Sequence, residues 1–222
     1  MFRKLLQLSI AVPFLFVVSC SDDDSPTVPQ SQFVVEQFPT DLGMWWRYAT
    51  VDTVFGELRY TVTYDTVRVE VIDSIAPRPP VPPVYRQMVW RYHGNTDSED
   101  RMVFVTSGSV TIDDIYFIEF GRARWPVTYW EFPMHVGSAW SLNPGMDTSV
   151  VASKGAITVP SGTFQDGYRV LFKWTALDSW ADRETWLVPN VGVVYYRFGL
   201  YGMVGIVSNS TWRLIDWSGN IR

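Results

Sequence analysis

The chain has 222 residues and a formal net charge of −5, and 47% of its residues are hydrophobic and 16% aromatic. The acidic balance and the absence of any run of Lys or Arg argue against nucleic-acid binding. The hydrophobic content can fill a substantial core, and the length suits one all-β domain. Because there is one cysteine, no disulfide can form within the chain, and the core must hold the fold.

The N-terminus has the layout of a secretory signal. Arg3 and Lys4 form a basic start, and the apolar run Leu5–Val18 follows it. That run is shorter than the about 20 helical residues needed to cross a bilayer core, so a transmembrane anchor is the weaker interpretation. We therefore predict that residues 1–19 are a signal peptide.

The signal ends in Val17-Val18-Ser19-Cys20, which resembles the lipobox of bacterial lipoproteins, with Val17 where leucine is commoner. The resemblance implies cleavage before Cys20, diacylglycerol on its thiol, and a further acyl chain, such as palmitate, on the new amino terminus. Two or three chains would hold the protein at a membrane, whereas one chain binds only marginally. The alternative is an ordinary secretory signal with a chance cysteine.

The residues after the lipobox are acidic. Ser21, Asp22, Asp23 and Asp24 open a polar segment that we predict to be a flexible tether over residues 20–32. They resemble the acidic export signal of surface-exposed lipoproteins in Bacteroidota-type bacteria. The resemblance implies a lipid-anchored protein on the outer face of the outer membrane, at the cell surface. A merely solvated linker is the alternative.

Alternation of apolar and polar residues predicts strands over most of residues 33–222. The apolar set of Leu58, Tyr60, Val62 and Tyr64 is even-numbered and the next set is odd-numbered, which predicts a bulge or a sharp bend near Asp65-Thr66. We predict a single antiparallel barrel, half-barrel or strongly curved sandwich, with the proline-rich segment 76–83 as a stiff loop. The strands are expected at 45–52, 58–64, 67–71, 84–92, 101–106, 109–119, 150–159, 168–174, 184–188, 191–198 and 212–217.

One pattern, F-P-x-x-apolar-G-x-x-W, occurs twice, at residues 38–46 and 132–140. Its glycines suit turns and its tryptophans suit the core. The repetition indicates either two related β units that close one sheet or a recurrent device at strand entrances.

The second half, residues 132–217, contains "VPSGTF" and "WLVPNVGVV" in addition to that pattern. It resembles β-rich domains of uncharacterised bacterial lipoproteins. The resemblance implies a hairpin turn at Pro160 and Gly162, a core position for Phe164 and a close backbone approach at Gly192. It implies a fold and no chemistry.

No catalytic, cofactor or metal site is predicted. His93 and His135 are far apart, and no G-x-S-x-G motif supports a triad. Two acidic groups could serve a glycosidase, namely Asp113 with Asp114, and Asp178 with Asp182 and Glu184. We expect the first pair to mark a bulge or turn, and nothing in the sequence places the second group in a pocket. We therefore expect no enzymatic activity.

The segment "LDSWADRETW", residues 177–186, is the best candidate for ligand contact. Trp180 lies among polar residues and could stack on a sugar ring. Asp178, Asp182 and Arg183 could bond sugar hydroxyls. Trp186 is expected in the core.

The expected function is that of a non-enzymatic surface lipoprotein that binds a ligand or a partner, or has a structural role. One alternative is a carrier that holds a lipid or another apolar ligand inside the β-barrel. A second is a glycan-binding or glycan-processing surface protein. The only implied partner is the membrane, through Cys20. A concave face that is open and lined by Trp and Tyr would favour the carrier.

Overall fold

The computed structural model describes residues 32–56, 59–75, 84–94, 98–118, 121–142, 145–203 and 205–220. Residues 31–222 form one compact unit. In the described ranges no helix has the length and hydrophobicity that a membrane span requires. Cys20, the segment Ser21–Asp24 and the loop 76–83 lie outside the described residues, so the predictions made for them stay predictions.

The described part of the chain is nearly all strand, with two short 3-10 helices, η1 (Val35–Gln37) and η2 (Ser218–Asn220). The strands form one antiparallel sheet in the order β6-β5-β4-β3-β2-β1-β12-β11-β10-β9-β8-β7. Their bounds are β1 (Trp45–Gly56), β2 (Arg59–Ile75), β3 (Val84–His93), β4 (Ser98–Thr106), β5 (Ser109–Ile118), β6 (Gly121–Glu131), β7 (Ala139–Trp140), β8 (Asp147–Val159), β9 (Gly162–Thr175), β10 (Ser179–Val188), β11 (Gly192–Gly202) and β12 (Gly205–Trp217).

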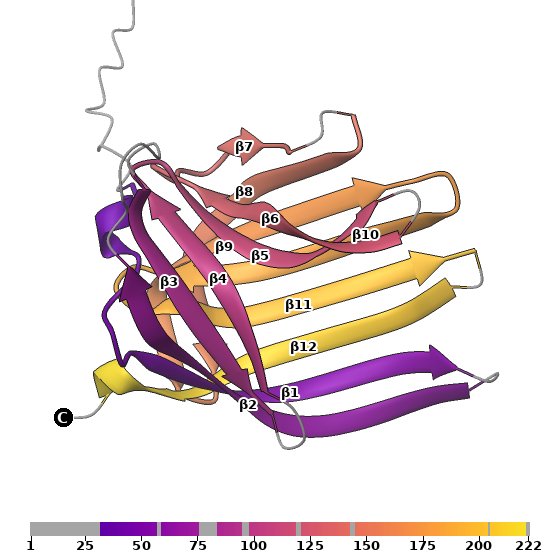
Figure 1. Cartoon of the computed structure of the whole chain (residues 1–222), viewed down its shortest axis with the longest axis horizontal. Coiled ribbons are helices and arrows are strands. Elements are labelled where there is room, and N and C mark those ends of the chain that lie inside the picture. The colour runs from indigo at the N-terminus through magenta and orange to yellow at the C-terminus, as the bar shows by residue number, and fades with distance from the viewer. Residues whose placement is uncertain are drawn as a thin grey trace, which may run out of the picture. The chain divides into compact units, whose positions relative to one another are not determined.

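The sheet folds over on itself. Strands β3 to β5 cross in front of β9 to β12, so that two layers face each other (Figure 1). The first strand, β1, pairs with the last, β12, whereas β6 and β7 are the two edges of the sheet. The all-β prediction is confirmed, and among its three forms the fold is a strongly curved sandwich.

Trp130 holds β6 against the opposite layer. Its side chain is 1% exposed and packs near Phe38 and Tyr129, with ring centroids 5.6 and 5.3 Å away. The indole Nε1 donates a hydrogen bond to Thr185 Oγ1 on β10 at 3.2 Å. Because β6 is an edge strand, this contact helps to attach that edge to the other layer.

The repeated F-P-x-x-apolar-G-x-x-W pattern forms the same backbone turn twice. Gly43 N–H donates to Val71 O and Gly137 N–H donates to Val151 O, both at 2.8 Å. Both glycines have positive φ, at +80° and +94°, where glycine is favoured. Each turn precedes six strands, β1–β6 and β7–β12, and these halves join where β1 pairs with β12. The pattern therefore marks two similarly built β units in one sheet.

Both tryptophans of this pattern are buried, with Trp46 2% and Trp140 7% exposed, as predicted. The implied hairpin turn after β8 is present, and Gly162 has a φ of +137°. At Gly192 a Cβ atom would lie 3.0 Å from Pro39 Cγ, so the close approach is confirmed. Phe164 is only partly buried and packs against Trp217 at the margin of the core.

Two predicted irregularities are absent. The pairing of β1 with β2 runs without a shift through Asp65-Thr66, so the bulge predicted there is wrong. Asp113 and Asp114 lie inside β5 in regular pairing with β6, so they mark neither a bulge nor a turn. Along β2 the apolar residues move from one face of the strand to the other, while the backbone pairing with β1 stays regular. Val69 and Val71 are buried, whereas Tyr64 on the opposite face is 75% exposed.

Candidate functional site

The predicted contact segment 177–186 is divided by the strand it belongs to. Alternate side chains of a strand point to opposite faces. On β10, Arg183 points into the space between the layers and is 6% exposed, whereas Trp180 lies on the outer face and is 46% exposed. Asp182 is also on the outer face, and Asp178 is exposed in the loop before β10. The structure therefore separates Arg183 from the other three predicted contact residues.

Trp180 does present a ring at the surface, but one of its faces is covered. It stacks on Tyr201 of β11 with ring centroids 5.3 Å apart and an angle of 6° between the planes. The Tyr201 hydroxyl donates to Asp182 Oδ1 at 3.4 Å, which ties the two outer-face residues together. Glycan binding at this pair stays a prediction. Trp186 is half-buried on the same outer face and packs against the margin of the core, so it is not a fully buried core residue.

The outer face of β9 to β11 carries a ladder of opposite charges. Arg169 pairs with Glu184 at 2.7 Å, and Arg197 pairs with Asp182 at 3.1 Å. Glu184 also accepts a hydrogen bond from Trp186 Nε1 at 3.1 Å. Burial raises the pKa of Glu184, but the hydrogen bonds from Arg169 and Trp186 and the nearby arginine charges outweigh burial and lower it. These acids hold the strands together and do not face a common pocket.

Replacing Glu184 with Gln is expected to flatten the loss of stability in acid. A carboxylate with a lowered folded-state pKa stabilises the fold above its unfolded-state pKa of about 4.3. That contribution disappears as the pH falls through the lower folded-state value. Melting curves from pH 7 to pH 3 should show the largest difference between the native chain and Glu184→Gln at pH 7, closing in acid. Asp178→Asn, at an exposed position, is the control. A constant difference across the range would contradict this role.

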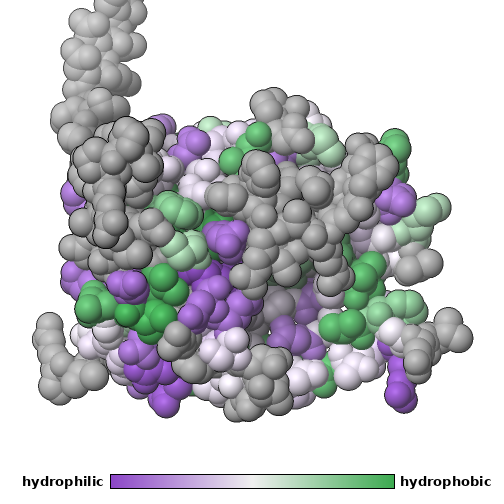
Figure 2. Space-filling view, viewed as in Figure 1, coloured by the Kyte–Doolittle hydropathy of each residue, from purple (hydrophilic) through white to green (hydrophobic). Residues whose placement is uncertain are grey.

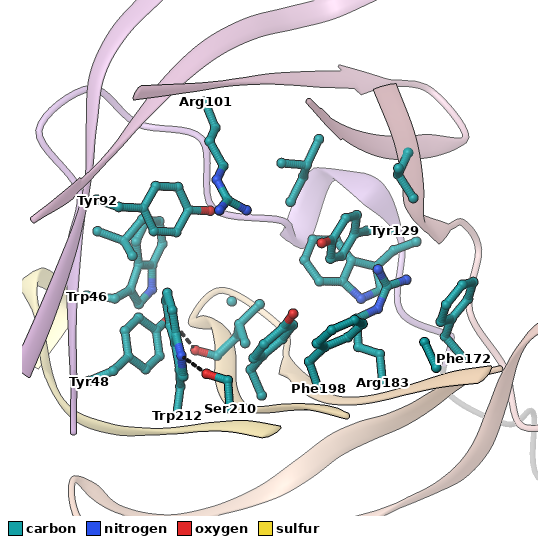
Figure 3. Close-up of a pocket in the computed structure, with 18 of the residues that line it drawn as sticks. Trp46, Tyr48, Tyr92, Arg101, Tyr129, Phe172, Arg183, Phe198, Ser210 and Trp212 are labelled. Atoms are coloured by element: carbon teal, nitrogen blue, oxygen red, sulfur yellow. Dashed lines mark hydrogen bonds between the residues drawn. The ribbon is translucent and has the colours of Figure 1, made fainter. Parts of the chain in front are cut away.

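The larger candidate site is a cavity between the two layers, with a volume of about 580 Å³. That size falls within the roughly 300–1,000 Å³ typical of small-molecule sites. Its wall is mainly aromatic and aliphatic, and the side chains converge on an open space (Figure 3). The aromatic members are Phe38, Trp46, Tyr48, Tyr92, Tyr129, Trp130, Phe172, Trp174, Tyr196, Phe198 and Trp212.

Most polar groups of this wall are already engaged. The Tyr48 hydroxyl donates to Val193 O at 2.8 Å, and the Trp212 indole donates to Ser210 Oγ at 2.7 Å. Burial, and then the neighbouring Tyr92, raise the pKa of Tyr48 well above its ordinary value, so its hydroxyl stays neutral. This side of the cavity is therefore suited to an apolar group.

Arg183 carries a charge that no described carboxylate balances. Its guanidinium lies between two rings, 3.7 Å from the Tyr129 centroid and 4.6 Å from the Phe172 centroid. Its Nη2 atom is buried and lacks a hydrogen-bond partner among the described residues. No described Asp or Glu forms an ion pair with it, and none lines the cavity. The wall of the cavity thus contains a buried positive charge with an unused donor.

A second arginine, Arg101 of β4, reaches the cavity from the facing layer (Figure 3). Its guanidinium lies 4.8 Å from the Tyr92 ring centroid and pairs with Glu99 at 3.1 Å. Because a carboxylate already balances Arg101, it differs electrostatically from Arg183.

The cavity extends from the turn region of Trp46 and Gly192 to the hairpin ends of β1, β11 and β12. At those ends Val54 lines the cavity and is 53% exposed, so the cavity reaches solvent there. Hydrophobic residues are visible at this end of the molecule (Figure 2). Leu177 and Met203, in neighbouring hairpin loops, are also exposed. The entrance therefore has an apolar rim.

Among the side chains that the structure describes, His135 does not line this cavity. His135 is exposed, and its Nδ1 lies 3.0 Å from Ser138 Oγ in the second repeat turn. Across the ranges that the structure describes, no three His, Cys, Asp or Glu side chains gather as a metal site would require.

Sequence reasoning named Arg183 but placed it on the wrong face, and it did not find the cavity. The signal that could have corrected Arg183 was alternation, since Ala181, Arg183 and Thr185 share the parity of buried positions on β10. The cavity itself depends on how the sheet folds, which no local pattern reports.

Comparison with known proteins gives only distant structural likenesses. No protein-family model and no curated protein matches the chain. An inferred exported protein with a YmcC-like fold from Bacteroides fragilis has 14% identity and a TM-score of 0.47, over 85% of this chain and 100% of that one. An inferred lipoprotein from Parabacteroides distasonis has 15% identity and a TM-score of 0.45, over 85% and 100%. Both likenesses are too distant to assign a function.

Proposed function

We propose that the chain is a membrane-anchored, non-enzymatic lipoprotein whose β domain binds a mostly apolar molecule with one anionic group in the cavity between its layers. The observation that carries the proposal is Arg183, a buried guanidinium without a carboxylate among the described residues. The aromatic wall opposite it supplies the surface for an apolar body.

The energetic argument rests on the cost of burying charge. A guanidinium stays charged in proteins, and a buried charge without a counterion costs several kcal/mol. The rings of Tyr129 and Phe172 offset part of that cost by cation–π attraction, which is worth about 2 kcal/mol when desolvated. An anion that accepts a hydrogen bond from Nη2 would offset the rest. Ligand binding therefore explains why the fold retains this residue.

The chemical class of the ligand follows from the residues that line the cavity. A carboxylate or similar anion matches the planar set of N–H donors on the Arg183 guanidinium. An alkyl chain or fused apolar ring matches the tyrosine and tryptophan surfaces. A fatty-acid-like molecule combines both. Because no described carboxylate lines the cavity, the paired acids that a glycosidase needs are not found there, which supports binding over hydrolysis.

The proposal is tested by calorimetric titration of the protein with dodecanoate and with dodecanol, its neutral counterpart. We expect dodecanoate to bind at one site per chain and more tightly than dodecanol. Ser208→Trp, which would fill the cavity from β12, should abolish both titrations while the melting temperature stays near that of the native protein. Dodecanoate binding that persists in Ser208→Trp, or no binding by the native protein, would reject the cavity as the site.

Anchoring through Cys20 is a separate part of the proposal. Replacing Cys20 with Ala should release the protein from the membrane fraction, because several acyl chains give stable anchoring and would then be missing. Fractionation with detergent partitioning measures this. Continued partition of Cys20→Ala into detergent would contradict lipidation. The acidic run Asp22–Asp24 supports a location at the cell surface, on the outer face of the outer membrane.

A further inference from the structure

One half of β2 is an open edge. Residues 68–75 of β2 pair with β3, whereas Arg59–Val67 pairs only with β1 in the part of the chain that the structure describes. This half forms the lower margin of the sheet beside β1 (Figure 1). Its residues 59–64 are all exposed, and Tyr60, Val62 and Tyr64 together form an apolar row on the outer face.

The backbone of this half can accept another strand. Val71, an odd-numbered residue of β2, donates its N–H to Met44 O in the segment just before β1. Its backbone polar groups therefore point toward the β1 side. Because the β1–β2 register is uninterrupted, the odd-numbered residues of β2 direct their N–H and C=O groups toward β1, and the even-numbered ones direct theirs away. The groups of Tyr60, Val62 and Tyr64 therefore point to the open edge. Such a row is a template for pairing with another chain.

The sequence of this edge is complementary to itself. Residues 59–65 read Arg-Tyr-Thr-Val-Thr-Tyr-Asp, which is a palindrome about Val62 except for its ends, and these ends have opposite charges. When two copies run antiparallel with Val62 opposite Val62, each tyrosine faces a tyrosine and each threonine a threonine. Arg59 of each copy then faces Asp65 of the other.

We propose that this open edge of β2 pairs with the same edge of a second copy of the chain, with a two-fold axis at Val62. The register is specified by charge. A shift of two residues in either direction removes both Arg59–Asp65 pairs and places a tyrosine opposite valine. Directly opposed unlike charges and aromatic pairs favour one register over its neighbours. A two-fold contact of a surface with itself is the commonest arrangement in homodimers. The inference does not depend on the cavity.

Disulfide trapping in the full-length chain tests whether the two-fold axis lies at Val62. At hydrogen-bonded antiparallel positions the Cα atoms lie about 5.5 Å apart, within the range of about 4.4–6.8 Å that a disulfide spans. Val62→Cys should therefore form a covalent dimer on mild oxidation in membranes. Thr66→Cys is exposed on the same strand and face, but its two copies would be roughly 26 Å apart, so it should not. The chain without an added cysteine reports any background from Cys20.

We expect the Val62→Cys dimer band to be at least ten-fold stronger than that of Thr66→Cys. Equal bands would indicate random collision, no dimer would show that the edge does not self-pair, and a cross-link to a protein of another mass would show a different occupant. Each of these three results overturns the proposal.

A charge exchange in the Val62→Cys background tests the register. Arg59→Asp alone would place a carboxylate opposite Asp65 at both ends and should reduce the dimer band several-fold. Arg59→Asp combined with Asp65→Arg restores opposite charges at both ends and should restore the band. Protease resistance of each variant reports the fold. A band that is insensitive to the single change, or not recovered in the double variant while the fold is intact, would contradict the proposed register.

Discussion

Replacing Trp130 with Ala is expected to lower the free energy of unfolding by about 3–5 kcal/mol, the cost of removing a large buried aromatic side chain. Trp130 is 1% exposed and connects edge strand β6 to β10 through Thr185. For a domain of this size the loss corresponds to a fall in melting temperature of roughly 6–20 °C. Differential scanning calorimetry or chemical denaturation measures it.

Two variants separate the contribution of the Trp130 hydrogen bond from that of burying its indole ring. Thr185→Val removes the hydrogen bond, keeps the shape and leaves Trp130 Nε1 buried without this acceptor, so it should cost about 1–3 kcal/mol, less than Trp130→Ala. Trp180→Ala removes an indole that is 46% exposed and should change the stability far less than Trp130→Ala. If Trp130→Ala melted like Trp180→Ala, β6 would not be held to the opposite layer by this side chain.

Replacing Arg183 with Met is expected to weaken dodecanoate binding roughly 10- to 150-fold. A hydrogen bond to a charged group is worth about 1.5–3 kcal/mol, and each 1.4 kcal/mol is about ten-fold in affinity. Dodecanol, which lacks the charge, should lose much less. Arg197→Met is the matched control, because Arg197 lies on the outer face, paired with Asp182. Calorimetric titration of both ligands into both variants measures the effect.

The stability of ligand-free Arg183→Met distinguishes a binding role from a structural one. Replacing a buried charge by an apolar side chain of similar size is often neutral or stabilising. We therefore expect the melting temperature to stay the same or rise while binding is lost. A large fall in melting temperature with unchanged dodecanoate affinity would make Arg183 part of the scaffold.

The sequence located β8 to β12 of the second half but not β7, and β9, β10 and β12 begin five to seven residues before their predicted starts. The strands that were found have turn residues near their ends and clear alternation. Hairpins such as β8–β9, with Gly162 in its turn, are of this kind. Strand β6 was missed because Pro126 interrupts its pattern. Proline cannot donate to a ladder and is tolerated at sheet edges, and β6 is an edge strand.

The error at Asp65-Thr66 has a physical reason that also bears on function. A change of phase in the apolar residues was interpreted as a change in the backbone, on the premise that apolar residues face the core. In β2 the backbone is regular, and Tyr60, Val62 and Tyr64 are apolar on the solvent side. These three residues, which depart from the pattern of buried apolar positions, lie on the open edge of β2.

The candidate site could be predicted only in part. The sequence analysis named an open concave face lined by Trp and Tyr only as the feature that would favour a carrier, and it singled out Arg183 among the contact residues. That its charge lies opposite Trp212 and Tyr92, which belong to strands far apart in the sequence, depends on the folding of the sheet into two layers (Figure 3). Such long-range placement leaves no local periodicity in the sequence.

The most direct test of the proposed function is a crystal structure of the protein with 12-bromododecanoate, because anomalous scattering locates the bromine. We predict that the carboxylate accepts a hydrogen bond from Arg183 Nη2 and that the bromine lies in the cavity between the two layers, against the aromatic wall that includes Trp46 and Trp212. A ligand bound on the outer face beside Trp180 and Tyr201, with the cavity free of it, would contradict the proposal.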